Sequence, residues 1–445
     1  MSLDVHLGGK RIGWLHPSGG ESLPPSERDG CSFAYLPELV EEAAGVPLLS
    51  YALPVRAEPY GPADTCPYLE GLLPAGSRRQ QIAAELGIDA GDSYALIAAL
   101  GGDCPGGVTF LPEGEPPAPR APDTLAWLDE DELEELVGEE EPEHLFDPER
   151  EQRMRFLLPG EGHKLALIRD EQEDRWAWPE PGAPSTHIVK PESEDRPGMA
   201  VNEMACTLAL REMGFPVVHT ELGEIAGRAC LVSKRFDRWG ESAGVERLHQ
   251  ESLSQALGYL PQEREGEGLG YAESRELLTA LGEENSIQAL FAVSYCRWLI
   301  GSRDDAHGRS SALLYTGSGP LLAPFYDISS ASVYEDPTEP ISLEELVRRN
   351  SCLVGLVQIA IECDYSLEGA VLAAIDTIGR LCKALGGVAA RAQAEDWYEP
   401  VIDEVLQRVF DCMKSLRNEM EILKPPSLGG PQRPSGPPTP GGECP

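Results

Sequence analysis

Three features are scarce or missing in this 445-residue sequence: lysine, long apolar runs and paired cysteines. Seven of the 36 basic residues are Lys. Gln288 and Arg297 interrupt the apolar stretch 286–300, so no apolar segment reaches the 18 residues of a membrane span. The eleven cysteines form no CxxC pair and do not combine with the eight histidines at zinc-ligand spacing. The first thirty residues lack a basic region followed by an apolar one. Unpaired thiols without a secretory signal predict a cytoplasmic protein.

Acidic residues, by contrast, are abundant. The 75 Asp and Glu residues leave a net charge of −39, which disfavours direct contact of the bulk surface with DNA or an anionic membrane. Thirteen of these residues lie in 129–151, a segment with one Arg. We interpret that segment as a solvated, partly helical face rather than as a binding site.

Composition divides the chain into four parts. A Pro- and Gly-rich N-terminal subdomain covers 1–112, with a hairpin predicted around Gly8-Gly9 and short helices at 78–86 and 93–100. An acidic, Pro-rich connector (113–153) leads to a larger domain at 154–423. The tail 424–445 contains eight Pro and five Gly and is predicted to be disordered.

The larger domain begins with strands and continues with helices. Strands are predicted at 164–169, 176–178 and 187–190 and on both sides of Ala226-Gly227, and helices at 200–213, 286–301 and 400–424. We therefore expect an α+β, bilobal architecture, with an N-lobe at about 154–240 and a mostly helical C-lobe at about 241–423.

Two segments carry glycine or lysine where a phosphate could bind. Pro159-Gly160-Glu161-Gly162-His163-Lys164 precedes a predicted strand, and its backbone N–H groups could cradle phosphate oxygens. A Gly-x-Gly segment between strands is more often merely a turn, and Walker spacing is absent. Lys190 ends the β-like run 186–190 immediately before Pro191. In a chain this poor in lysine it is either a surface residue or a phosphate ligand.

Two further segments place charged residues after apolar runs. The run 230–233 leads into Lys234-Arg235-Phe236-Asp237-Arg238, which is either a sheet edge with surface ion pairs or a hinge facing a planar ring. The apolar helix ending at Gly301 delivers Asp304, Asp305 and His307 to a loop, and Asp327 follows the run 321–326. Phosphoryl transfer needs one carboxylate to orient the attacking hydroxyl and another to hold Mg²⁺; helix capping is the alternative role.

Taken together, these segments resemble the HipA family of bacterial serine/threonine protein kinases. The resemblance covers about residues 1–335 and rests on ordered motifs at 53–56, 70–74, 98–104, 159–160, 164–167, 186–191, 202–203, 235–238, 247–251, 255–258, 305–307 and 326–327. It implies a protein-kinase-like fold that binds ATP and Mg²⁺. It also implies a toxin whose partner is a small DNA-binding antitoxin of HipB type and which phosphorylates a protein; known substrates of the family include aminoacyl-tRNA synthetases.

The resemblance also implies roles for single residues. Gly160, Glu161, Gly162, His163 and Lys164 would lie over the ATP phosphates. Lys190 would contact the α- and β-phosphates with Glu203 as its partner, and Lys234, Arg235 and Phe236 would form the hinge at adenine. Asp305 would be the catalytic base, supported by His307, and Asp327 would bind Mg²⁺.

Four positions depart from the family pattern. Ser310 stands where a second Mg²⁺ ligand is usually Asn, and a hydroxyl is the weaker ligand. One extra residue near Arg303 makes Asp304 an alternative base. Leu157 replaces a regulatory Ser, and Ser252 replaces an acidic residue. The alternatives to an active protein kinase are therefore a pseudokinase that binds nucleotide or a partner, and a small-molecule kinase.

Overall fold

The N-terminal part of the chain is built on an antiparallel sheet of four strands. The computed structural model describes residues 2–17, 30–117, 125–138, 157–160, 162–179, 183–240, 245–260, 271–302, 310–335 and 366–422. The predicted hairpin joins β1 (Leu3–Leu7) to β2 (Lys10–Pro17), and Gly8 and Gly9 adopt the positive φ angles of 56° and 80° that its turn requires. The sheet order is β3-β2-β1-β4, with β3 at Cys31–Tyr35 and β4 at Val108–Pro112.

Four helices complete this N-terminal domain: α2 (Pro37–Ala43), α3 (Pro62–Glu70), α4 (Gly76–Leu86) and α5 (Ser93–Leu100). The sequence predicts α4 and α5 closely, because Gly87 and Gly101 end their patterns. It misses α3, whose Pro62 and Pro67 hide a helical pattern. Side chains from the sheet and from α3, α4 and α5 share one apolar core.

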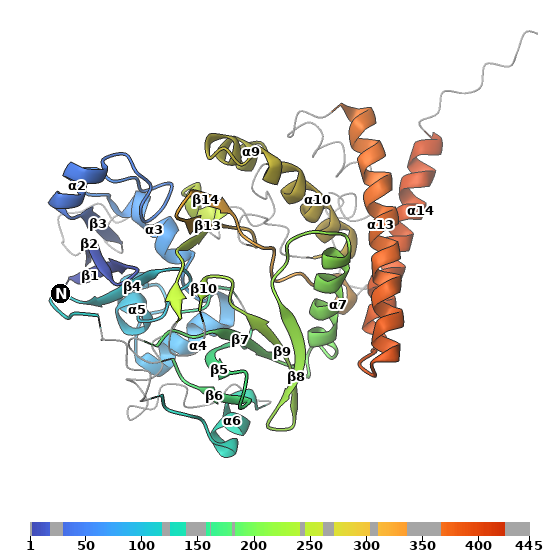
Figure 1. The fold of residues 1–445 in the computed structure, drawn as a ribbon, viewed down its shortest axis with the longest axis horizontal. Helices are drawn as coiled ribbons and strands as arrows, with labels where there is room; N and C mark the ends of the chain where they lie inside the picture. Colours follow the sequence, from blue (N-terminus) through green and yellow to red (C-terminus); the bar gives the residue numbers. More distant parts are fainter. Residues whose placement is uncertain are drawn as a thin grey trace, which may run out of the picture.

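A second sheet of five antiparallel strands forms the next layer of the molecule (Figure 1). Its order is β6 (Arg175–Ala177), β5 (Leu165–Asp170), β7 (His187–Pro191), β9 (Arg228–Lys234) and β8 (Thr220–Ile225). One face packs Val189 and Val232 against α6 (Glu130–Val137). The helix α7 (Met199–Glu212) contacts β8 and β9 from the side of the helical core.

The acidic connector is partly built into this sheet. The amide of Leu128 donates to the Trp176 carbonyl at 2.9 Å, and Leu136 and Val137 of α6 are buried in the sheet's apolar core. The acidic residues of α6 occupy its other side, because apolar residues recur at helical spacing only on the buried side. The segment 125–138 is therefore part of the sheet layer, and its acidic side is solvated as expected.

The described residues beyond this sheet are mainly helical, which confirms the expected α+β class. Two small sheets, β10 (Arg238–Trp239) with β11 (Glu246–Arg247) and β12-β13-β14 (Gln250–Ser252, Ala312–Thr316, Gly319–Leu322), border the large helical core. That core gathers side chains from α7, α8 (Leu253–Ala256), α9 (Tyr271–Ala280), α10 (Glu284–Ile300), α13 (Leu367–Ala394) and α14 (Val401–Ile422).

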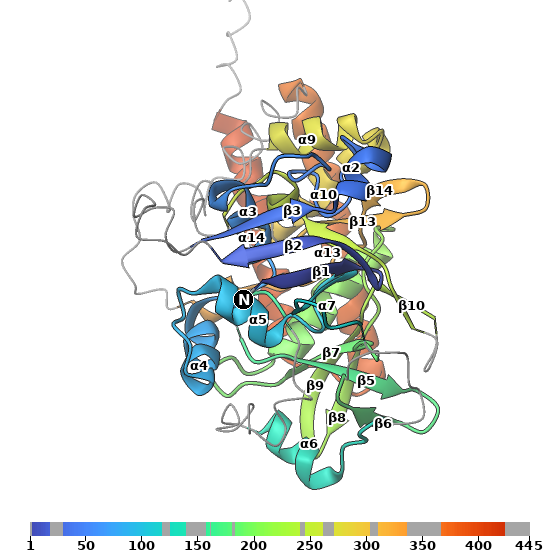
Figure 2. The ribbon, with the colours of Figure 1, turned by 90° about the vertical axis from the view of Figure 1, so that its left-hand side faces the viewer.

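The helical hairpin α13–α14 lies at the opposite end of the molecule from the first sheet (Figure 1), and the turned view shows that sheet face-on (Figure 2). Between them, the segment after β14 lies beside β7 and the residues after β9, where Asp327 pairs with Lys190 and Tyr326 stacks on Phe236. None of the helices among the described residues is long and apolar enough to cross a membrane.

Candidate active site

A group of three charged side chains, here called the Lys190 cluster, lies where the five-stranded sheet meets α7. Strand alternation decides its position: Val189 faces α6, so Lys190 lies on the opposite face, toward α7. Its ammonium donates to both carboxylate oxygens of Glu203 at 2.8 Å and forms an ion pair with Asp327. The structure therefore brings Asp327 to Lys190 and Glu203, although Lys190 precedes Asp327 by 137 positions in the sequence.

The charges in the Lys190 cluster do not balance. Burial alone would lower the pKa of Lys190, but the carboxylates of Asp327 and Glu203 outweigh it and raise that pKa above its ordinary value. The Lys190 ammonium holds the pKa of Asp327 below its usual range, while burial raises the pKa of Glu203. One cation thus faces two carboxylates, and the Asp327 side chain remains 37% exposed.

Asp327 is held by its neighbours in the chain. The Phe325 amide donates to the Pro216 carbonyl at 2.9 Å, and Arg297 of α10 donates to the Tyr326 carbonyl at 2.9 Å. Asp327 itself has a φ of 56°, a left-handed conformation that Asp and Asn tolerate better than other side chains. The carboxylate consequently projects from a short segment with a fixed backbone.

Two buried polar residues, to which no predicted motif gave a role, fix this segment. Asn202, one residue before Glu203, exchanges hydrogen bonds with the Ser330 backbone, at 2.8 Å to its carbonyl and 2.9 Å from its amide. Arg297 is fully buried and also donates to the Ser310 carbonyl at 2.7 Å. The signal available in the sequence was an Arg within an otherwise apolar helix, which needs buried acceptors.

The glycine-containing segment lies against the N-terminal domain. Gly160 and Gly162 have φ angles of 91° and 85°, and the Gly160 carbonyl accepts from the Ala75 amide at 3.2 Å. The Lys164 ammonium donates to the Pro159 carbonyl at 2.8 Å, and its charge also contributes to the lowered pKa of Asp327. Lys164 is therefore a second cation near the Lys190 cluster.

His163 is neutral at physiological pH. Burial lowers its pKa to about 4, and the nearby charges of Arg78 and Arg228 act in the same direction. A neutral imidazole adds no positive charge to the glycine-containing segment. In the described part of this segment, Lys164 is the cation that could bind a phosphate. The adjacent Lys190 cluster contributes Lys190 as a second one.

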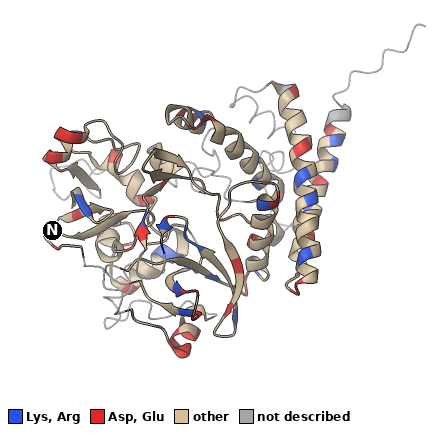
Figure 3. Ribbon diagram, in the orientation of Figure 1, with Lys and Arg blue, Asp and Glu red and all other residues tan. Residues whose placement is uncertain are grey.

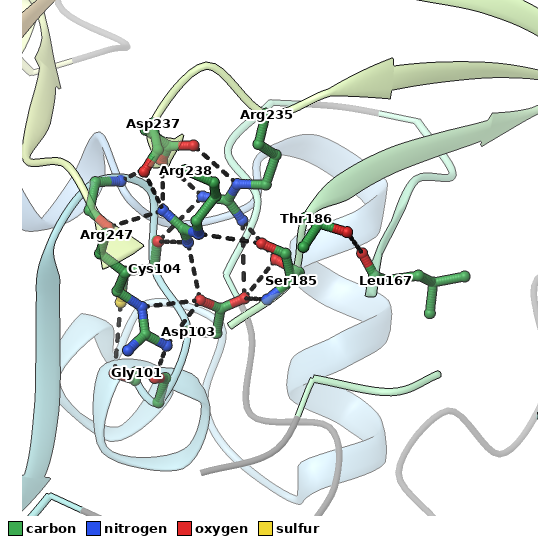
Figure 4. A network of polar contacts seen from close by, with 12 residues as sticks. Gly101, Asp103, Cys104, Leu167, Ser185, Thr186, Arg235, Asp237, Arg238 and Arg247 are labelled. Atoms are coloured by element: carbon green, nitrogen blue, oxygen red, sulfur yellow. Dashed lines mark hydrogen bonds and ion pairs between the residues drawn. The ribbon is translucent and has the colours of Figure 1, made fainter. Parts of the chain in front are cut away.

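The predicted hinge residues have three different environments. Phe236 stacks on Tyr326, with ring centroids 5.5 Å apart, which links this segment to the residue before Asp327. Lys234 pairs with the exposed Glu171 at 2.7 Å. The Arg235 side chain points away into a buried network with Asp103, so the backbone of this residue, rather than its guanidinium, is what a hinge could offer (Figure 4).

Four of the predicted site residues, Glu161, Asp304, Asp305 and His307, lie outside the described residues. Both ends of the loop that carries the last three are described. The Ser302 amide donates to the Arg297 carbonyl at 2.9 Å, and Ser310 is buried. Arg297 thus contacts both ends of that loop as well as the segment that carries Asp327.

The chemistry of the site suits a nucleotide with Mg²⁺. The described residues contain no group of three or more side chains able to hold a metal by themselves. Mg²⁺ usually binds one or two protein oxygens and completes its shell with waters and substrate phosphates. The part-exposed Asp327 carboxylate provides such an oxygen, Ser310 is the second predicted ligand, and the two lysines provide cations for phosphates.

The fold has the α+β, kinase-like arrangement of a HipA-type protein. It matches the HipA chain from the Shewanella oneidensis MR-1 HipA, HipB and operator DNA complex with a TM-score of 0.71, covering 94% of this chain and 97% of that one at 21% identity.

Sequence similarity identifies the family. The HipA N-terminal domain matches residues 3–111, and the HipA-like C-terminal domain matches residues 156–409. The chain belongs to the HipA family, as its motifs indicated.

Curated relatives agree with this assignment. The putative kinase Y4mE of Sinorhizobium fredii is 32% identical over 68% of this chain and 73% of that protein. The serine/threonine-protein kinase toxin HipA of Shewanella oneidensis is 27% identical over 62% of this chain and 65% of its own length. These similarities support a kinase-type enzyme.

Proposed function

We propose that this protein transfers the γ-phosphate of ATP, in the presence of Mg²⁺, to a Ser or Thr hydroxyl of a protein substrate. The observation that carries the proposal is the Lys190 cluster, in which a cation is held between one buried and one part-exposed carboxylate. Phosphoryl transfer depends mainly on positioning and on stabilising the charge of the phosphates. The sequence similarity to kinases of the HipA family supports the same reaction.

Each residue has a separate task in this reaction. Lys190, oriented by Glu203, would contact the α- and β-phosphates, and Asp327 and Ser310 would hold Mg²⁺, which neutralises charge that develops on the phosphates. Asp305 would accept the proton of the attacking hydroxyl, with Asp304 as the alternative base and His307 supporting the loop. Neutral His163 and the glycine-containing segment would cover the phosphates, with the hinge at 234–236 on the adenine.

The proposed biological role is that of a toxin with a HipB-type antitoxin partner. The solved relative was crystallised with HipB and operator DNA, which supports a comparable partner here. The net charge of −39 disfavours direct DNA contact by this chain and favours docking of a basic partner. Acidic residues are spread over the surface, with groups on α2 and α6 (Figure 3). An aminoacyl-tRNA synthetase is the proposed substrate class by family resemblance.

Comparison of two single variants tests the reaction and identifies the base. We expect Asp305→Ala to reduce transfer of labelled γ-phosphate to protein in a dialysed cell extract by at least about 10²-fold, and Asp304→Ala to reduce it much less. The reverse order would assign the base to Asp304. Full activity in Asp305→Ala, Asp304→Ala and Asp327→Asn would refute a kinase with this site, and label confined to small molecules would refute a protein substrate.

Ser310 favours one alternative, a pseudokinase that binds nucleotide or a partner without transferring phosphate. An amide is the better Mg²⁺ ligand, so we expect Ser310→Asn to raise the transfer rate at limiting Mg²⁺ by about 3- to 10-fold. The Mg²⁺ concentration for half-maximal rate is the measurement, with Ser311→Asn as the neighbouring control. An inactive wild type that becomes an efficient kinase through Ser310→Asn would establish the pseudokinase instead.

A further inference from the structure

The N-terminal domain contacts the proposed nucleotide site through a second buried group of charges, here called the Asp103 cluster. Asp103, which follows α5, belongs to the N-terminal domain. The other members come from the catalytic part (Figure 4): Ser185 precedes β7, Arg235 and Asp237 follow β9, and Arg238 and Arg247 lie on β10 and β11. The motif around Asp103 supported the family resemblance, but the proposed reaction gives it no task.

Asp103 binds three separate segments of the catalytic part. One oxygen, Oδ1, contacts Arg238 at 2.9 Å and Arg247 at 3.0 Å, and the other accepts from the Ser185 amide at 3.0 Å and its hydroxyl at 2.5 Å. Arg235 lies 3.8 Å from the same oxygen and also contacts the Ser185 hydroxyl at 2.8 Å. One carboxylate therefore determines the relative position of the residues on both sides of Phe236.

Backbone contacts reinforce this connection. Arg235 and Arg238 donate to the Cys104 carbonyl at 3.2 and 3.0 Å, and the Gly106 amide donates to Asp237 at 2.6 Å. Gly106 also packs tightly on β12, because a Cβ there would lie 2.6 Å from the Gln250 amide nitrogen. The segment 103–106 of the N-terminal domain is thus fixed against the residues after β9.

The centre of the cluster is closed to solvent, and only Arg247 at its edge is part-exposed among the charged members. The side chains of Asp103, Asp237, Arg235 and Arg238 are each 5% exposed or less. The charges of the arginines outweigh burial and hold the pKa of Asp103 below its usual range. No ligand has access to such a group, so its effect on the nucleotide site must be exerted through the backbone that it fixes.

We propose that Asp103 is a positioning residue for nucleotide binding: through Arg235 and Arg238 it fixes the 234–236 hinge from the N-terminal domain. The inference rests on the proposed function. The same domain also contacts the glycine-containing segment, where the Ala75 amide binds the Gly160 carbonyl. The N-terminal domain would therefore support the nucleotide site on both the adenine side and the phosphate side.

The test compares Asp103→Asn with a matched variant inside the N-terminal domain. Glu70→Gln removes the charge from an ion pair with Arg79 of 2.6 Å whose side chains are each 13% exposed, but that pair does not contact the hinge. We expect Asp103→Asn to weaken binding of a non-hydrolysable ATP analogue by about tenfold or more, raising KM for ATP more than it lowers kcat. Glu70→Gln should change the affinity by less than about twofold.

Hydrogen exchange provides a readout that needs no nucleotide. The amides of Lys234 and Arg235 donate to the carbonyls of His219 and Thr186 at 2.9 and 3.0 Å. We expect these two amides to exchange faster in Asp103→Asn, and to be unchanged in Glu70→Gln. Ser185→Ala keeps every charge and should increase the exchange rates of the same two amides by a smaller factor. This variant tests the positioning role if Asp103→Asn fails to fold.

The outcomes separate this inference from the proposed function. A wild type that does not bind the ATP analogue overturns both. A wild type that binds it, with Asp103→Asn and Ser185→Ala showing unchanged affinity and exchange, overturns the positioning role alone. Equal losses in Asp103→Asn and Glu70→Gln would also overturn it, because they would show a general effect of weakening the N-terminal domain.

Discussion

The two ion clusters of this chain use similar residues for different purposes. The Lys190 cluster has one cation for two carboxylates, and its Asp327 side chain is 37% exposed. The Asp103 cluster has three arginines for two carboxylates, and the two aspartates are 5% exposed or less. Charge imbalance combined with access is characteristic of a binding site, whereas charges closed off from solvent can act only on the protein that surrounds them.

Hydrogen bonding shows the same difference. Each oxygen of Asp103 and Asp237 has at least two polar contacts or a charged partner, so the cluster is satisfied without a ligand. Asp327 has Lys190 as its ion-pair partner and retains access for a metal ion. Substitutions in the Lys190 cluster should therefore lower activity with little loss of stability, whereas those in the Asp103 cluster should lower stability as well as nucleotide affinity.

The largest expected effect is on catalysis by Asp327→Asn. Asn tolerates the left-handed backbone at 327, and Lys190 keeps its two hydrogen bonds to Glu203, so the fold should be preserved. We expect the rate of phosphoryl transfer to fall by about 10³-fold, while the free energy of unfolding in urea changes by less than about 1 kcal/mol. A variant that is inactive because it is unfolded would contradict the distinction between the clusters.

The largest loss of stability is expected from Asp237→Asn. Asp237 contacts Arg235 at 2.8 Å and Arg238 at 2.9 Å, and removing its charge leaves these two buried arginines and the half-buried Arg247 with Asp103 alone. Breaking a buried ion pair costs about 3 kcal/mol, so urea denaturation should show a loss of that size. The exposed pair of Lys414 and Asp411 offers the control, because Asp411→Asn should cost less than about 1 kcal/mol.

The same cluster should contribute to acid sensitivity. Arg235 and Arg238 outweigh the effect of burial and lower the pKa of Asp237 to about 2. A carboxyl whose pKa is lower in the folded state stabilises the protein above its unfolded pKa, near 4, and that stabilisation is lost as pH falls toward 2. Asp237→Asn should therefore flatten the dependence of unfolding free energy on pH between about 4 and 2.

Local patterns allowed much of the fold to be predicted. The hairpin at Gly8-Gly9, the helices α4, α5, α7, α10 and α14, and the strands around Ala226-Gly227 follow from turn residues and apolar spacing. The third and fourth strands of the first sheet were missed, since β4 pairs with β1 across about a hundred residues and no local signal records that partner.

The candidate site divides in the same way. Lys190 and Asp327 follow apolar runs that could be recognised in the sequence, and the structure brings them together. Asn202, Arg297 and Asp103 could not be assigned roles, because each acts on backbone or charges distant in the sequence. Arg235 shows the limit most clearly: its motif indicated a hinge, yet its guanidinium belongs to the buried Asp103 cluster.

The smallest expected effect comes from Glu251, a buried carboxylate with neutral hydrogen-bond donors. Its Oε1 accepts from the Tyr51 amide at 2.9 Å and from the Tyr315 hydroxyl. Burial raises the pKa of Glu251 to about 7. Because the folded pKa exceeds the unfolded value, the protein is stabilised below about pH 4.5, and that stabilisation is lost as pH rises through 7.

We therefore expect Glu251→Gln to remove about 2 kcal/mol of the pH dependence of unfolding between pH 5 and 8, and to stabilise the protein at pH 8. Urea denaturation at both pH values measures this, with the exposed Glu41→Gln of α2 as the control. The pH window lies above that of Asp237, so the two contributions can be measured in one protein. If the dependence of the unfolding free energy on pH were unchanged in Glu251→Gln, a buried carboxylate would remain charged in this protein without a cation. The arginines would then not be the reason why the carboxylates of the Asp103 cluster are charged.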